Sequence, residues 1–148
     1  MPATALDTAG LQVPDAIPGV QKVDAEALIG LMSDEVGLLL IDSRIKSDRI
    51  HGYIEGSVSL PDIETSCLAL QNIAPSHNKA LLFYCNGVKC GRSVRAVRIA
   101  ELCGYTNLHW FRGGFEEWLR KASRFSRTDP AQRSSSCASV RKPTFPWS

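Results

Sequence analysis

The chain has 148 residues, of which 44% are hydrophobic and 22% are charged, and its formal net charge is +2. This length is enough for one domain with one hydrophobic core, and so small a charge argues against nucleic acid or a membrane surface as the main partner. No apolar run approaches the roughly 20 residues that span a bilayer. Because the N-terminus lacks the basic start and apolar segment of a secretory signal, we expect a cytoplasmic, reducing location.

Composition divides the chain into a central domain and two tails. Residues 1–18 are rich in Ala, Thr and Pro and are predicted to be a flexible lead-in. The predicted domain covers residues 19–122. Residues 123–148 combine several arginines with a serine run, and such a segment buries too little apolar surface to offset its ordering entropy. We therefore expect a basic, disordered tail, the alternative being that it docks through Phe145 and Trp147.

Within the domain, apolar strand patterns alternate with helical patterns. In chain order, we expect a strand at 20–23, a helix at 25–32 N-capped by Asp24, strands at 38–41 and 58–60, a helix from Pro61 towards Ile73, a strand at 80–84, a helix from the N-cap Ser93 through Cys103, a strand at 108–111 and a helix at 115–121. This alternation predicts an α/β domain with a mostly parallel central sheet flanked by helices. Sites in such sheets form beyond the carboxyl ends of the strands.

The five cysteines divide into two reactive candidates and three others. An odd number does not suggest a disulfide framework, and the expected compartment is reducing. Cys67 and Cys103 lie in apolar helical patterns and are interpreted as small buried hydrophobes. Cys137 lies in the serine-rich tail, where no specific role is expected. Cys85 and Cys90 therefore remain as the candidates for chemistry.

Cys85 directly follows an apolar strand and opens a nine-residue loop that ends at Ser93. Main-chain N–H groups of a loop that curls over its cysteine form an anion-binding nest, and the following helix adds the partial positive charge of its N-terminus. Together with two cations in the loop, these groups should lower the pKa of the thiol and favour the nucleophilic thiolate. The candidates for binding an anionic substrate are Asn86, Gly87, Val88, Lys89, Gly91, Arg92 and Ser93.

Four patches of sequence resemble the rhodanese homology domain, over about residues 20–122. They are Ile41-Asp42-Ser43-Arg44, Gly52-Tyr53-Ile54-Glu55-Gly56-Ser57, Phe83-Tyr84-Cys85 leading to Gly91-Arg92-Ser93, and Gly113-Gly114-Phe115-Glu116-Glu117-Trp118. In the second patch, Tyr53 and Glu55 stand where the family pattern has His and Pro. Each patch alone is weak, but four in order at the expected spacings are a specific signal.

The resemblance implies a rhodanese-like fold and a sulfurtransferase. Cys85 matches the catalytic position, where a sulfane sulfur is held as a persulfide, and Asp42 and Arg44 match a secondary signature. The implied partners are a small anionic donor such as thiosulfate and a thiol or cyanide acceptor, or a sulfur-relay protein. No cofactor is implied. The loop is two residues longer than the commoner pattern Cys-x-x-Gly-x-Arg-Ser, and it contains Cys90 as a possible second thiol.

Three other chemistries compete with sulfur transfer. Cysteine phosphatases and arsenate reductases use loops that resemble Cys-x5-Arg, but that spacing places Gly91 where the arginine belongs. Cys85 and Cys90 are spaced to form a disulfide if their Cα atoms come within about 7 Å. Cys90 would then resolve the persulfide and protect Cys85 from over-oxidation. A metal site is not expected, because the histidines show no recognisable ligand spacing; they are His51, His77 and His109.

A non-catalytic role is the alternative from a different class. A rhodanese-like module that only binds partners would use residues 123–148 as its interaction segment. The presence of Cys85 argues against this role, since inactive modules of the family often lack the cysteine. A sulfur carrier within a relay lies between the two classes, and the sequence does not separate it from a free-standing enzyme.

Overall fold

The structure, a computed structural model, describes residues 13–34 and 37–128. Its centre is a five-stranded sheet in the order β1-β5-β4-β2-β3, with every pair of neighbouring strands parallel. The strands are β1 (Gln21–Val23), β2 (Leu39–Asp42), β3 (Val58–Ser59), β4 (Leu81–Tyr84) and β5 (Leu108–Phe111). The predicted α/β fold with a parallel central sheet is confirmed.

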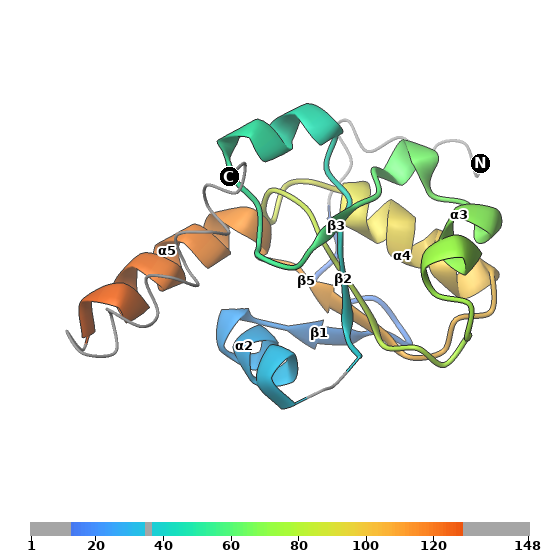
Figure 1. Cartoon of the computed structure of the whole chain (residues 1–148), viewed down its shortest axis with the longest axis horizontal. Helices are drawn as coiled ribbons and strands as arrows, with labels where there is room; N and C mark the ends of the chain where they lie inside the picture. Colours follow the sequence, from blue (N-terminus) through green and yellow to red (C-terminus); the bar gives the residue numbers. More distant parts are fainter. Residues whose placement is uncertain (1–12, 35–36, 129–148) are drawn as a thin grey trace.

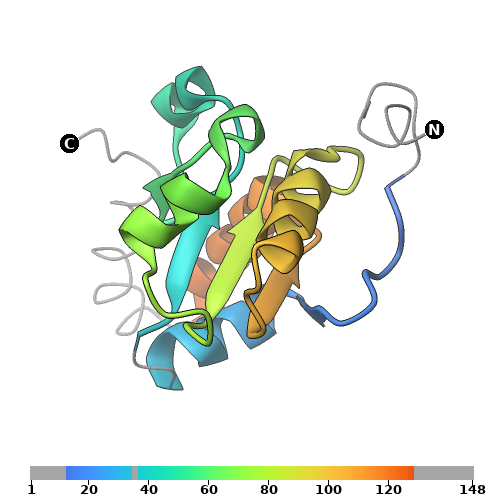
Figure 2. The ribbon, with the colours of Figure 1, turned by 90° about the vertical axis from the view of Figure 1, so that its right-hand side faces the viewer.

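Helices cover both faces of this sheet (Figure 1). They are α2 (Ala25–Asp34), α3 (Cys67–Ile73), α4 (Arg92–Leu102) and α5 (Gly114–Thr128), with two short 3-10 helices, η1 (Lys46–His51) and η2 (Asp62–Glu64). Residues of α3 and α4 pack on one face, and residues of α2 and α5 pack on the other. Figure 2 shows α4 in front of the sheet and α5 behind it. Among the described residues, no helix is long and apolar enough to cross a membrane.

The central strand β4 is buried on both faces, which explains its continuous apolar sequence. Successive side chains of a strand point to opposite faces. Leu81 and Phe83 accordingly join the core beneath α3 and α4, whereas Leu82 and Tyr84 join the core beneath α2 and α5. The next residue, Cys85, therefore leaves the sheet at the middle of its carboxyl edge.

The helix expected from Pro61 and the last helix differ from the sequence prediction. The single helix expected from Pro61 to Ile73 is interrupted, because η2 ends at Glu64 and α3 begins only after a new N-cap. That N-cap is Ser66, whose hydroxyl accepts a hydrogen bond from the N–H of Ala69 at 3.1 Å. The last helix, α5, runs on to Thr128 instead of ending at residue 121.

Part of the expected lead-in packs on the domain. Ile17 is only 3% exposed and belongs to the core beneath α4. The guanidinium of Arg112, just after β5, donates from Nε to the carbonyl oxygen of Pro14 at 2.8 Å. Residues 13–18 are thus held by both apolar and polar contacts. The remainder of the predicted lead-in, residues 1–12, and the tail over 129–148 lie outside the described residues.

A disulfide joins Cys67 to Cys103, and the interpretation of these residues as separate buried hydrophobes was wrong. Cys67 is the first residue of α3 and Cys103 is the C-cap residue of α4. Their Cα atoms lie 5.4 Å apart, within the usual range for a disulfide. The pairing depends on how two helix ends meet in the folded domain, which the local apolar pattern around each cysteine does not report.

Candidate active site

Cys85 lies at the carboxyl end of β4 and is only 2% exposed. The N-terminus of α5 holds the start of its loop by the main chain. The N–H of Phe115 donates to the carbonyl oxygen of Cys85 at 2.9 Å, and the N–H of Glu116 donates to that of Asn86 at 2.8 Å. Helix N-termini carry N–H groups without intrahelical partners, so these bonds fix the loop and satisfy the helix at the same time.

Gly114, the first residue of α5, makes this contact possible. Its φ of +61° lies in the left-handed region that favours glycine. A Cβ atom there would collide with the carbonyl oxygen of Cys85 and would approach the N of Gly87 to 2.9 Å. The second glycine of the fourth sequence patch is thereby explained by a close approach between α5 and the cysteine loop.

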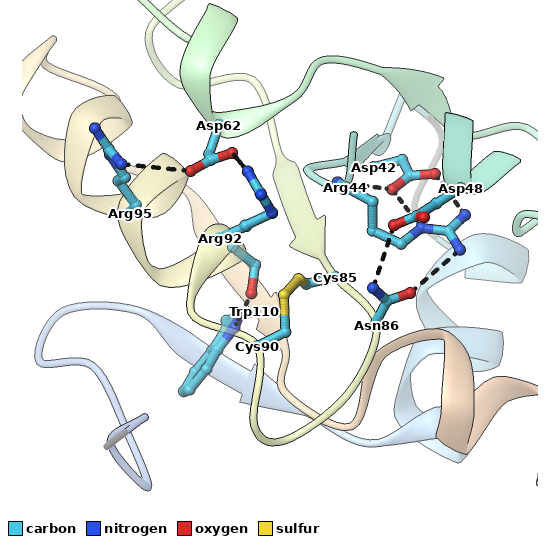
Figure 3. Close-up of a disulfide and its surroundings, with 11 residues drawn as sticks. Asp42, Arg44, Asp48, Asp62, Cys85, Asn86, Cys90, Arg92, Arg95 and Trp110 are labelled. Carbon is cyan, nitrogen blue, oxygen red and sulfur yellow. Dashed lines mark hydrogen bonds and ion pairs between the residues drawn. A yellow bond between two sulfur atoms is a disulfide. The ribbon is translucent and has the colours of Figure 1, made fainter. Parts of the chain in front are cut away.

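The loop folds back so that Cys90 reaches Cys85. The N–H of Cys90 donates to the carbonyl oxygen of Gly87 at 3.1 Å, which closes a tight turn. A disulfide joins Cys85 to Cys90, with the two Cα atoms 6.3 Å apart (Figure 3). The predicted ability of this pair to form a disulfide is confirmed. Cys85 is buried and Cys90 is half-buried, so Cys90 is the more accessible end of the bond.

The helix after the loop begins earlier than predicted. Gly91 is the N-cap residue and α4 starts at Arg92, so the assignment of Ser93 as the N-cap was wrong. Ser93 is buried inside the first turn, and its hydroxyl accepts a hydrogen bond from Nε1 of Trp110 at 2.8 Å. Ser93 therefore anchors α4 to the neighbouring strand β5. The main-chain N–H groups of the first turn of α4 still lie directly after the loop, as an anion site would need.

The cationic side chain of Arg92 is paired with a buried carboxylate. Its Nη1 contacts Oδ1 of Asp62 at 2.7 Å, and Arg95 reaches the other oxygen of the same carboxylate at 3.7 Å (Figure 3). Asp62 is 3% exposed, whereas the side chain of Arg92 is 36% exposed. Sequence analysis missed Asp62. Its position just beyond β3, at the carboxyl edge of the sheet, was the signal that would have found it.

On the other side of the disulfide, Asp42 and Arg44 form a buried ion pair (Figure 3). Asp42 accepts hydrogen bonds from Nε of Arg44 at 2.9 Å and from Nη2 at 2.8 Å, and Arg49 donates to the same carboxylate at 2.8 Å. Burial alone lowers the pKa of Arg44, but the hydrogen bonds and charge of Asp42 raise it overall. The guanidinium of Arg44 is therefore charged throughout the physiological range.

This ion pair reaches the loop through Asn86. Nη1 of Arg44 lies 3.5 Å from Oδ1 of Asn86, whose amide nitrogen donates to Asp48 at 3.3 Å. The guanidinium of Arg44 also lies 4.6 Å from the ring centroid of Phe115 in α5. Asp42 and Arg44 thus position the loop and do not contact the sulfur. Asp48 and Arg49, both in η1, were not predicted, because that segment shows no strand or helix pattern.

The remaining loop residues form an open rim. Asn86, Val88 and Lys89 are exposed, whereas Gly87 is buried. A Cβ atom at Gly87 would lie 2.5 Å from Oε1 of Glu116, so the glycine admits this carboxylate next to the loop. Glu116 adds a negative charge that sequence analysis did not consider. No group of three or more His, Cys, Asp or Glu within the described part of the chain is arranged to hold a metal ion.

These features define the class of rhodanese folds: a parallel α/β sheet, a cysteine loop at the end of its central strand, and a helix that begins at a glycine and packs on that loop. The Rhodanese-like domain family matches residues 24–121, and the chain belongs to this family.

Solved structures show the same fold. Protein BH2092 of Bacillus halodurans is 20% identical with a TM-score of 0.60, over 68% of this chain and 72% of its own. The human single-domain sulfurtransferase TSTD1 is 25% identical with a TM-score of 0.56, over 69% of this chain and 97% of its own. A thiosulfate sulfurtransferase of Pseudomonas aeruginosa is 21% identical with a TM-score of 0.55, over 69% of this chain and 19% of its own. A search of curated protein sequences found no match.

Proposed function

We propose that this protein is a sulfurtransferase that takes a sulfane sulfur from a small anionic donor such as thiosulfate and holds it as a persulfide on Cys85. The observation that carries the proposal is the position of Cys85, buried at the carboxyl end of β4 and at the start of the loop that leads into the N-terminus of α4. The partial positive charge of that N-terminus favours a thiolate and attracts an anion. The exposed Lys89 lies in this loop, and the half-buried Arg92 is the first residue of α4.

The reaction begins from the reduced loop, because Cys85 is a nucleophile only when its disulfide with Cys90 is open. The Cys85 thiolate attacks the sulfane sulfur of thiosulfate. A new S–S bond forms on Cys85, the S–S bond of thiosulfate breaks, and sulfite leaves with the bonding electron pair. A thiol or cyanide then attacks the outer sulfur and returns Cys85 to the thiolate. The thiolate form requires no general base near the sulfur.

Replacing Cys85 tests this proposal. After reduction, the wild type incubated with thiosulfate and cyanide is expected to form thiocyanate, and Cys85→Ser is expected to form none above background. The double variant Cys67→Ser/Cys103→Ser is the matched control, since it removes the other disulfide, which joins α3 to α4. Full activity of Cys85→Ser would contradict the proposal. Mass spectrometry supplies a second readout, because a persulfide adds about 32 Da to the protein.

A further inference from the structure

The disulfide connects the proposed sulfur acceptor to a second cysteine of the same loop. We propose that Cys90 resolves the persulfide on Cys85 and releases its outer sulfur as hydrosulfide, leaving the Cys85–Cys90 disulfide as the product. A dithiol reductant then reopens the disulfide. This inference rests on the proposed persulfide function, and it names the class of the second substrate: a protein or small molecule with two adjacent thiols.

The geometry supports an attack by Cys90 on the inner sulfur of the persulfide. That inner sulfur is Sγ of Cys85, the same atom to which Cys90 is bonded in the structure. The turn between Gly87 and Cys90, closed by a 3.1 Å hydrogen bond, brings the second cysteine back over the first. The backbone of Cys85 is held separately by α5. The loop can therefore deliver Cys90 to this sulfur without displacing the end of β4.

The resolving step balances without an external oxidant. The Cys90 thiolate attacks Sγ of Cys85, the Cys85–Cys90 bond forms, and the bond from Sγ to the outer sulfur breaks. The electron pair of that bond leaves on the outer sulfur, which takes a proton as hydrosulfide. The sulfane sulfur gains two electrons, and the two cysteine sulfurs together lose two. Thiol–disulfide exchange proceeds by this type of in-line attack on a sulfur.

The exposure of the two cysteines predicts where the reductant attacks. Cys90 is half-buried, whereas Cys85 is 2% exposed. The first thiolate of the dithiol therefore attacks Sγ of Cys90 and expels the Cys85 thiolate, which the N-terminus of α4 stabilises. The second thiol of the reductant then attacks the mixed disulfide. It closes its own disulfide and frees Cys90, so that both cysteines are ready for another turnover.

A single-turnover experiment tests the resolving step. Reduced wild type and reduced Cys90→Ser are desalted without oxygen, incubated with thiosulfate, and desalted again. The wild type is expected to release about one equivalent of hydrosulfide and to lose two titratable thiols. Cys90→Ser is expected to release none and to keep the added mass of about 32 Da. Cys67→Ser/Cys103→Ser serves as the matched control and is expected to release hydrosulfide as the wild type does.

The outcomes separate this inference from the proposed function. If both proteins keep a stable persulfide and neither releases hydrosulfide, the resolving role of Cys90 is overturned and the persulfide function stands. In that case the disulfide is only an oxidised resting state. If Cys90→Ser acquires no added mass and the wild type releases no hydrosulfide, the persulfide function itself fails.

The reductant step has its own test. The oxidised protein is mixed with a thioredoxin whose second active-site cysteine is replaced by serine, so that a mixed disulfide accumulates. Peptide mapping is expected to find the thioredoxin on Cys90. A mixed disulfide on Cys85, or no adduct, would overturn the proposed order of attack.

Discussion

At the scale of single residues, two buried carboxylates balance only part of the arginine charge around the cysteine loop. Asp62 is shared by Arg92 and Arg95, and Asp42 is shared by Arg44 and Arg49. Lys89 is exposed on the rim of the loop. An anionic donor therefore meets a cation that is already shared with a buried carboxylate. We expect each cation to contribute modestly to donor binding, with the main-chain N–H groups of α4 supplying the remainder.

Replacing Arg92 tests this balance. We expect Arg92→Ala to raise the KM for thiosulfate by about 2- to 10-fold, because the charge beside the anion is only partly available. The same change should lower the free energy of unfolding by about 1–3 kcal/mol, since the buried Asp62 loses its nearest cation. Arg98→Ala is the control, because Arg98 is an exposed residue of the same helix. An unchanged KM for Arg92→Ala would show that the N–H groups dominate.

Tyr84, the last residue of β4, should make the stability of the domain depend on pH in the alkaline range. Burial, and then the charge of Asp42, raise the pKa of its phenol far above the ordinary value of 10.0. A group whose pKa is raised on folding stabilises the fold fully below its unfolded pKa, and this stabilisation is lost as the pH rises towards the folded pKa. We expect the free energy of unfolding to fall above about pH 10 in urea titrations, and Tyr84→Phe to remove part of that dependence.

The same replacement should weaken the domain at neutral pH. The Tyr84 hydroxyl accepts from the N–H of Ile54 at 3.1 Å and lies 3.0 Å from the hydroxyl of Ser57. Tyr84→Phe leaves both buried groups without this partner, which costs about 1–3 kcal/mol. An unchanged pH profile in this variant would mean that other tyrosines account for the alkaline loss.

At the scale of elements, the contact between α5 and the cysteine loop links folding to the site. Gly114 lets the first turn of α5 lie against the carbonyl oxygen of Cys85, and two main-chain hydrogen bonds follow from that approach. Glu117 of the same helix accepts a hydrogen bond from the N–H of Ala25, at the start of α2, at 2.8 Å. The N-terminus of α5 therefore holds both the loop and the neighbouring helix.

Adding one methyl group at this contact should impair the site. We expect Gly114→Ala to lower the free energy of unfolding by about 1–3 kcal/mol, from the strained φ and the collision with the loop, and to lower kcat for thiocyanate formation at least several-fold. Gly30→Ala is the matched control. Gly30 lies inside α2, and a Cβ there meets nothing within 4 Å, so we expect a gain of about 0.4–1 kcal/mol. Equal effects of the two changes would contradict this role of Gly114.

At the scale of the whole molecule, local patterns predicted the sheet well and the tertiary pairings poorly. The strand at 108–111 was predicted to the residue, and the strand leading to Cys85 to within one, because buried parallel strands form short continuous apolar runs. Asp62 was missed because its partner Arg92 comes from an element thirty residues later. The start of α4 was misplaced because Ser93 bonds to Trp110 instead of capping the helix.

The Cys67–Cys103 disulfide bears on both stability and location. It closes a segment with a sequence separation of 36 residues that contains β4 and the whole cysteine loop. Disulfides persist mainly in oxidising compartments, and this pair therefore does not favour the expected cytoplasmic location. That location stays a prediction. We expect Cys67→Ser/Cys103→Ser to lower the free energy of unfolding by about 2–4 kcal/mol, measured by urea unfolding without reductant. No difference from the wild type would indicate that the bond is open in solution.

The hydrogen bond between Trp110 and Ser93 also gives the loop an optical reporter. The indole is buried, and its Nε1 donates to Ser93 in the first turn of α4, three residues after Cys90 of the disulfide (Figure 3). Indole emission is quenched by a nearby disulfide and responds to a change in the polarity around the ring. We therefore expect the fluorescence of Trp110 to differ between the open loop, the proposed persulfide and the closed disulfide. The emission of this buried indole would then allow each step of the proposed cycle to be timed.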